Sequence, residues 1–328
     1  MSAAALQALP FIVVALAIAG LVAFGTTPLA GRVALRLGAI DHPDERRVHA
    51  RPIPRAGGLA VAVAFIGVGL IAVWLVGRAV LPIRIGEPTS TGLAVLFGGA
   101  VLAAVLGFVE DVVQLRARWQ LLFQLVLALV VVVGGLTIAA VTNPFGGGNI
   151  VFAAPFAVVF TVLWVVGMIN SINFIDGLDG LSSGVALIAA ATLGLISVTT
   201  SFDQPGIALL CAVLVGSLAG FLPWNFHPAR IFIGTTGVYV VGFALAVLSI
   251  LGTAKVAVAL LVLGVPIIDT FWIIVRRLVA GQSPFTPDRG HLHHRLLDMG
   301  LGHRGAVLVI YGICIVLAVL SLVLSGTG

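Results

Sequence analysis

The stretch Gly92–Val109, GLAVLFGGAVLAAVLGFV, decides the fold class, because it offers 18 consecutive residues without a charged side chain. A helix needs about 20 mostly apolar residues to cross the hydrocarbon core of a bilayer. The chain repeats this pattern, since 60% of its 328 residues are hydrophobic and only 9% are charged. A water-soluble protein of this size could not bury so much apolar surface. The sequence therefore predicts an all-α, polytopic membrane protein with one integral-membrane domain over residues 1–328.

Ten apolar segments are long enough to be membrane spans. They cover residues 8–29, 57–77, 92–109, 119–141, 150–169, 179–199, 206–222, 231–251, 255–275 and 305–325. An even number of spans places both termini on the same side of the membrane. Basic residues in short loops mark the cytoplasmic side. The loops after the odd-numbered spans hold 14 of the 17 Lys and Arg residues and the other side holds three, so we expect both termini outside the cytoplasm.

The remaining polar residues gather on the same predicted cytoplasmic face. All seven histidines and ten of the twelve acids fall there. Sorting of positive charge explains the arginines but not the acids or the neutral histidines, so we expect an active site on this face. No charge lies deep in a span, which argues against a transporter or lipid flippase. The basic residues of the membrane loops predict membrane lipids as partners, and no nucleic acid.

The first of four polar segments, residues 41–58, is rich in arginine. Pro52 and Pro54 hold it extended, so its guanidinium groups suit contacts with phosphate. The alternative is a loop that only sets topology and touches anionic lipid headgroups. Its candidate substrate-binding residues are Arg46, Arg47, His49 and Arg55.

The second and third segments carry oxygen ligands. Glu110 and Asp111 directly follow the span over 92–109. Adjacent acids repel each other and are best tolerated beside a cation, which predicts a magnesium ion or an arginine there. A hydrated helix end is the alternative. Residues 170–184, NSINFIDGLDGLSSG, repeat an amide or acid every three residues, which places them on one face of a helical turn. These repeated positions are Asn170, Asn173, Asp176 and Asp179.

The fourth segment, residues 284–297, reads PFTPDRGHLHHRLL. Its imidazole and guanidinium groups can donate hydrogen bonds to a diphosphate. A zinc site and a solvated loop are the alternatives. The candidate residues are Arg289, His291, His293, His294 and Arg295.

Together these segments resemble those of the polyprenyl-phosphate N-acetylhexosamine-1-phosphate transferases, the glycosyltransferase 4 family. The DG-x-DG motif at 176–180 and the H-x-HHR motif at 291–295 carry most of the resemblance. The second motif looks more like that of the branch that uses UDP-N-acetylglucosamine. The resemblance extends along nearly the whole chain.

The resemblance implies an enzyme of the bacterial cytoplasmic (inner) membrane that binds polyprenyl (undecaprenyl) phosphate and a UDP-sugar. With Mg²⁺, or Mn²⁺ in its place, the lipid phosphate attacks the sugar-linked phosphate. The products are polyprenyl-diphosphate-sugar and UMP, and the reaction initiates cell-wall polymer or surface-glycan synthesis. A homodimer is compatible with this expectation.

The resemblance also implies residue roles. The residues implied in catalysis are Glu110, Asp111, Asp176, His291, His293 and His294. Those implied in substrate binding are Arg46, Arg47, His49, Arg55, Asn170, Asn173, Arg289 and Arg295. The implied metal ligands are Asp111, Asp176 and Asp179.

Three positions depart from the family pattern. Glu110 stands where the family usually has Asp, and Gln120 lies near a usual Lys. Thr235 replaces the Asp that the family uses as a metal ligand, and a hydroxyl is a poor substitute for an anionic oxygen. Two hypotheses follow: an active transferase with an altered metal shell, or a catalytically impaired relative that binds lipid phosphate or nucleotide sugar without turnover.

Overall fold

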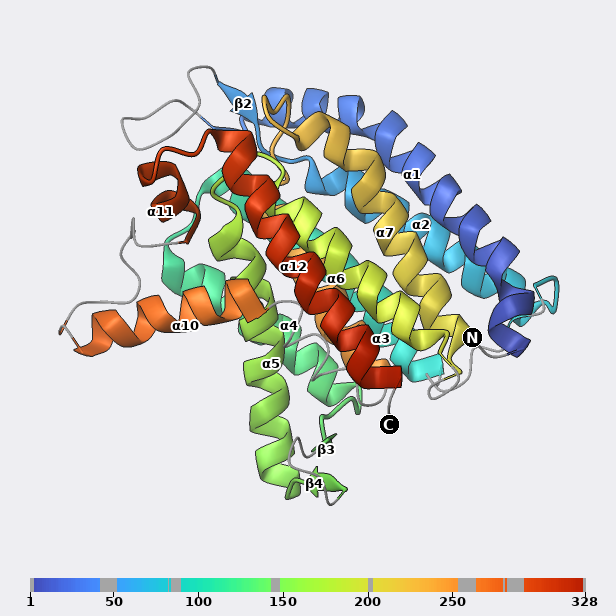
Figure 1. Cartoon of the computed structure of the whole chain (residues 1–328). Coiled ribbons are helices and arrows are strands. Elements are labelled where there is room, and N and C mark those ends of the chain that lie inside the picture. Colours follow the sequence, from blue (N-terminus) through green and yellow to red (C-terminus); the bar gives the residue numbers. More distant parts are fainter. Residues whose placement is uncertain are drawn as a thin grey trace.

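The computed structural model describes residues 3–41, 52–81, 83, 90–142, 148–199, 203–252, 264–279, 281 and 292–326, and these form mainly helices (Figure 1). The first eight helices are α1 Ala3–Leu37, α2 Gly58–Gly77, α3 Ser90–Val113, α4 Ala117–Val133, α5 Ala154–Ile175, α6 Leu181–Ser197, α7 Pro205–Asn225 and α8 Gly234–Leu251. They are followed by α10 Gly264–Val279, α11 Leu292–Asp298 and α12 His303–Gly326. Two strand pairs, β1 Ile40–Asp41 with β2 Ile53–Pro54 and β3 Ala140–Thr142 with β4 Asn149–Val151, are small exceptions to the predicted all-α fold.

Seven of the described helices are long and apolar enough to cross a membrane, namely α1, α2, α3, α5, α7, α8 and α12. Each overlaps one predicted span, so the prediction of a polytopic membrane protein is confirmed. The core of the bundle is α8, in which 17 of the 18 residues are buried. Helices α3 and α5 pack against α8, and α1 packs along α7.

Two other predicted spans correspond to shorter apolar helices. Helix α4 has 17 residues and ends before Gly134, so the predicted span over 119–141 is too long. The helix ends here because Gly135 adopts φ +79°, a left-handed conformation that cannot continue the helix and that glycine accepts at low cost. Helix α6 also has 17 residues, within the predicted span over 179–199.

The predicted span over 255–275 is described only from residue 264 onward. Helix α10 packs against α5 but lies across the direction of that helix, extending sideways from the bundle (Figure 1). Its last turn carries Arg276 and Arg277, while Phe271 and Trp272 are exposed. Such an amphipathic helix is suited to a membrane interface rather than to a path along the other spans.

Both chain termini lie at one end of the bundle, and β2 and α11 lie at the other end (Figure 1). At this second end, backbone hydrogen bonds join β2 and the start of α2 to the residues just before α8. The N–H of Phe232 donates to the carbonyl of Pro54 at 2.8 Å, and the N–H of Gly58 donates to Ile233 O at 2.8 Å. Arg55, directly after β2, is thereby fixed beside the first residues of α8.

Glycines let the backbones of α2, α3 and α8 approach closely at the same end. A Cβ atom at Gly58 would overlap the backbone of Gly237, and a Cβ at Gly107 would lie 2.6 Å from the Cα of Thr236. Real side chains essentially never come this close, so larger residues at these positions would push the helices apart. The close crossing brings the end of α3, with its two acids, against the N-terminus of α8.

Candidate active site

A cavity of about 970 Å³ opens at the end of the bundle that carries β2 and α11. Its walls come from β2 and the residue after it, the turn after α5, the loop between α7 and α8, and the starts of α11 and α12. This volume is in the range of ligand-binding pockets. The cavity brings together five residues predicted from three separate motifs: Arg55, Asn173, Asp176, Asp179 and His294.

The DG-x-DG motif forms the turn between α5 and α6. Gly180 adopts φ +80°, a left-handed conformation that glycine accepts without steric cost, and the next residue starts α6. The hydroxyl of Tyr311 donates to the carbonyl of Gly180, which ties the turn to α12. The buried ring of His293 packs on Gly177, where a Cβ atom would overlap Nε2 of the histidine. His293 therefore positions the turn.

Asp176 follows the last residue of α5 and lines the cavity. Its Oδ1 accepts a hydrogen bond from the hydroxyl of Ser182 at 2.5 Å. Burial raises the pKa of Asp176 to about 6, and the nearby charge of Asp179 adds to this shift, whereas Ser182 and the charge of Arg55 oppose it. A carboxylate whose negative charge is so poorly compensated is suited to binding a cation.

Arg55 connects the cavity to the acidic pair at the end of α3. Its Nε donates to Asp111 Oδ1 at 3.2 Å, and its Nη2 lies 3.5 Å from Glu110 Oε2. Both acids are almost completely buried, with exposed fractions of 0% and 4%. The arginine partly neutralises the pair while still lining the cavity.

Asp111 is bound to the N-terminus of α8. Its Oδ1 accepts from the N–H of Thr235 at 2.8 Å, and its Oδ2 accepts from the N–H and the hydroxyl of Thr236 at 2.9 and 2.5 Å. Unpaired N–H groups and the helix dipole favour a carboxylate at this end of a helix. Because both oxygens are engaged and Asp111 does not line the cavity, it anchors α3 to α8 in this structure rather than offering a free metal ligand.

The three departures from the family pattern each have a defined place. Gln120 Nε2 donates to Glu110 Oε1 at 2.8 Å and to the carbonyl of Leu115 at 3.1 Å. The longer acid at 110 is thus paired with a neutral amide. Thr235 lines the cavity, and its N–H contacts Asp111.

The two predicted asparagines have different surroundings. Asn170 Nδ2 donates to Gln124 Oε1 at 2.6 Å and to Val166 O at 2.9 Å. These contacts tie Asn170 to α4 and to its own helix. Asn173, about one turn further along α5, lines the cavity.

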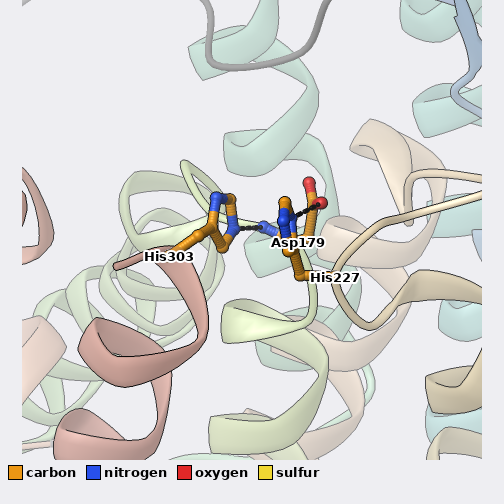
Figure 2. Close-up of side chains that lie close together, drawn as sticks. All are labelled: Asp179, His227 and His303. Atoms are coloured by element: carbon orange, nitrogen blue, oxygen red, sulfur yellow. Dashed lines mark hydrogen bonds and ion pairs between the residues drawn. The ribbon is translucent and has the colours of Figure 1, made fainter. Parts of the chain in front are cut away.

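Among the cavity residues that the sequence analysis missed are two histidines, His227 and His303. His227 Nδ1 lies 2.7 Å from Asp179 Oδ2, and the N–H of Asp179 donates to His303 Nε2 at 2.8 Å (Figure 2). The available signal was their position among the seven histidines of the predicted cytoplasmic face. They lie outside the four polar segments, so only the fold reveals their proximity to Asp179.

The other predicted residues do not line the cavity or are not described. Arg295 is exposed on α11. Five predicted residues lie outside the described part of the chain, namely Arg46, Arg47, His49, Arg289 and His291.

The oxygen donors of the cavity fit a magnesium ion. Asp176 and Asp179 each supply a carboxylate, and Asn173 supplies an amide. Magnesium typically takes one or two protein carboxylates and completes its shell with water and substrate phosphates. These donors therefore suit Mg²⁺ without a contribution from Asp111.

Comparisons with known proteins agree on one family. Residues 93–253 match the family model described as "Glycosyl transferase family 4". The chain is 38% identical over 322 residues to the "Probable undecaprenyl-phosphate N-acetylglucosaminyl 1-phosphate transferase" of Bacillus subtilis, an alignment that covers 96% of this chain and 85% of that protein. It is 38% identical to the "Decaprenyl-phosphate N-acetylglucosaminephosphotransferase" of Mycobacterium leprae, with 89% and 78% covered. It is 28% identical to the "Undecaprenyl-phosphate alpha-N-acetylglucosaminyl 1-phosphate transferase" of Thermotoga maritima, with 84% and 78% covered.

Proposed function

The chain belongs to glycosyl transferase family 4, and on that premise we propose that it transfers N-acetylglucosamine 1-phosphate, or a related N-acetylhexosamine 1-phosphate, from a UDP-sugar to polyprenyl phosphate. An oxygen of the lipid phosphate attacks the phosphorus that carries the sugar, and the bond from this phosphorus to the bridging oxygen of UMP breaks. The products are polyprenyl-diphosphate-sugar and UMP. The names of the relatives support this reaction.

The observation that carries the proposal is the convergence of distant segments on one cavity. Arg55, Asp176, Asp179 and His294 all line it, at the end of a bundle of membrane-length helices. An acceptor that is a lipid requires a site at the membrane surface. Phosphoryl transfer relies mainly on positioning and charge neutralisation, and these residue types supply both.

The basic residues bind and orient the two phosphorylated substrates in this proposal. Arg55 is held in place by its contacts with Asp111 and Glu110, so its remaining N–H groups can donate to a diphosphate without reorganisation. Arg230 lines the same cavity, with its guanidinium carbon 5.6 Å from the centre of the Trp224 ring. His294 adds a donor from α11.

Mg²⁺ would be held by Asp176 and Asp179. Bound there, it would neutralise charge on the diphosphate during transfer. In this role the ion would add to the counter-charge that Arg55 supplies to Asp176. Asp111 holds the framework behind the site.

The proposed topology has both termini outside the cytoplasm and the cavity on the cytoplasmic side of a bacterial inner membrane. Two observations support it: the cytoplasmic bias of the arginines in the sequence, and the position of both termini at the end of the bundle opposite β2 and α11 (Figure 1). A cytoplasmic site gives access to UDP-sugars. The product would initiate a cell-wall polymer or surface glycan.

The test is UMP release by the purified protein in detergent or nanodiscs with Mg²⁺, undecaprenyl phosphate and a panel of UDP-sugars. We expect UMP with UDP-N-acetylglucosamine or a related UDP-N-acetylhexosamine, and we expect the release to require the lipid. The Asp176→Asn variant, which retains an acceptor for Ser182, should release at least about 100-fold less UMP. Binding of UDP-sugar without any UMP release would show a catalytically impaired relative instead.

A further inference from the structure

The first residue of α12, His303, supports the turn that carries Asp179, although it belongs to none of the four polar segments of the sequence (Figure 2). The N–H of Asp179 donates to Nε2 of His303 at 2.8 Å. Because a backbone N–H can only donate, this ring nitrogen is the acceptor. His303 therefore fixes the main chain of the DG-x-DG motif at Asp179.

The carboxylate of Asp179 is fixed by a second set of contacts. Its Oδ2 accepts the N–H of Ala229 at 3.0 Å and lies 2.7 Å from Nδ1 of His227. The ring of His303 stacks on that of His227, with centroids 4.1 Å apart and planes 18° from parallel. His303 thus supports Asp179 twice, directly at the backbone and through His227 at the side chain.

These contacts leave the other carboxylate oxygen available to a ligand. Oδ2 of Asp179 has two partners, whereas Oδ1 has no hydrogen-bond partner among the described residues. Asp179 also lines the cavity. A carboxylate that is held by one oxygen presents the other in a defined direction, which reduces the ordering cost of binding a cation.

Further contacts hold α12 against the same wall of the cavity. Arg304 Nε donates to the carbonyl of His227 at 3.1 Å, and the hydroxyl of Tyr311 donates to the carbonyl of Gly180. His303 and Tyr311 are eight residues apart, so they lie on the same side of the helix. Helix α12 therefore joins the turn before α6 to the loop after α7.

A group that orients a metal ligand typically changes the affinity for the metal about 10–100-fold when it is mutated. We propose that His303 is a positioning residue of the transferase, which keeps Oδ1 of Asp179 turned toward the cavity for Mg²⁺. The inference rests on the proposed function, in which Asp179 is a ligand of Mg²⁺. It assigns to His303 no contact with the ion or with the substrates.

Three substitutions of His303 separate its two contacts. His303→Gln can place its amide oxygen near the position of Nε2 and keeps an acceptor for the N–H of Asp179, whereas the shorter side chain of His303→Asn cannot reach it. His303→Phe keeps a ring that can stack on His227 but has no acceptor. The matched control is Ser321→Ala, a substitution at a buried position of α12 that is 18 residues further along the chain.

The first measurement is Mg²⁺ binding by calorimetry. It uses the full-length protein in detergent, stripped with EDTA and without substrates. We expect His303→Asn and His303→Phe to weaken Mg²⁺ binding at least about tenfold, and His303→Gln to weaken it less than about threefold. Ser321→Ala should bind Mg²⁺ like the unmodified protein. Thermal melting checks that each variant is folded.

The second measurement is UMP release at varied Mg²⁺ concentration. The Mg²⁺ concentration for half-maximal release should rise by the same factors, while KM for UDP-N-acetylglucosamine at saturating Mg²⁺ should change less than about twofold. General damage to the fold would not be confined to the Mg²⁺ dependence, and His303→Gln would not relieve it. This split therefore distinguishes positioning of Asp179 from a merely structural role.

The outcomes separate this inference from the transferase function. Unchanged Mg²⁺ affinity in both His303→Asn and His303→Phe, or equal losses in all three substitutions of His303, would overturn it even if the protein releases UMP. An unmodified protein that binds no Mg²⁺ would overturn it as well. Binding changes as expected without UMP release from any UDP-sugar would contradict the transferase but support the orientation of Asp179 by His303. If His303→Phe does not fold, the comparison of His303→Gln with His303→Asn decides.

Discussion

The substitution Asp176→Asn offers a quantitative test of the metal-free site. Asp176 has a pKa of about 6 in the folded protein, against an ordinary value of 3.8, and burial is the main cause. The shift of about 2 pKa units corresponds to about 3 kcal/mol at about 1.4 kcal/mol per unit. The folded state therefore opposes ionisation of Asp176 by up to about this free energy.

The sign of the effect on stability follows from proton binding. Between about pH 4 and pH 6 the folded protein holds a proton on Asp176 that the unfolded chain has lost, so stability falls as the pH rises through this window. Asparagine is neutral at every pH and retains an oxygen that accepts from Ser182. The Asp176→Asn variant should thus be more stable than the unmodified protein by about 1–3 kcal/mol near pH 7.5, and equally stable near pH 3.5.

The assay is thermal melting of both proteins in detergent with EDTA. At about 2 °C per kcal/mol for a chain of this size, Tm should rise by about 2–6 °C near pH 7.5 and converge with that of the unmodified protein toward pH 3.5. Added divalent ion should raise Tm of the unmodified protein more than that of the variant, because the ion compensates the charge of Asp176. A variant that melts at or below the unmodified protein near pH 7.5 would refute the reasoning.

Three further predictions concern the packing and the ligands of the site. Gly177→Ala forces a methyl group onto His293, so we expect a loss of about 1–3 kcal/mol in thermal melting; in a His293→Ala background the same substitution should cost much less, and equal losses in the two backgrounds would contradict the contact. Thr236→Val removes a buried donor to Asp111 and should cost about 1–3 kcal/mol, whereas Thr235→Val, which keeps its N–H bond to the same acid, should melt close to the unmodified protein; similar losses in the two variants would count against this assignment. Thr235→Asp adds an anionic oxygen to the cavity and should tighten Mg²⁺ binding at least about tenfold in calorimetry, while an unchanged affinity would mean that residue 235 does not face the ion.

The sequence was sufficient to predict the membrane fold and much of the cavity. Long apolar runs have one stable solution in a bilayer, so seven predicted spans appear as helices of spanning length in the described structure. The DG-x-DG turn and Arg55 reach the same cavity because their motifs end or precede spans at the same side. Helix ends were harder to predict, as α4 shows, since Gly134 and Gly135 lie within an apolar run that hydropathy alone would continue.

The roles of individual acids could not be read from the sequence. Asp111 has the residue type of a metal ligand, but only the fold places the N-terminus of α8 against both of its oxygens. His227 and His303 stand 76 positions apart and outside the four polar segments. Their proximity to Asp179 depends on the packing of the loop after α7 beside α12, which periodicity does not encode.

The central claim, transfer of a sugar together with its phosphate, is tested most directly with UDP-N-acetylglucosamine carrying ³²P in the phosphate next to the sugar. The account predicts that the label moves into the organic-extractable lipid fraction and that unlabelled UMP appears in the aqueous phase in equal amount. Label that remains in water as UDP while the sugar enters the lipid would show transfer of the sugar alone. Label that remains wholly in the unreacted UDP-sugar, with every metal ion offered, would contradict the account.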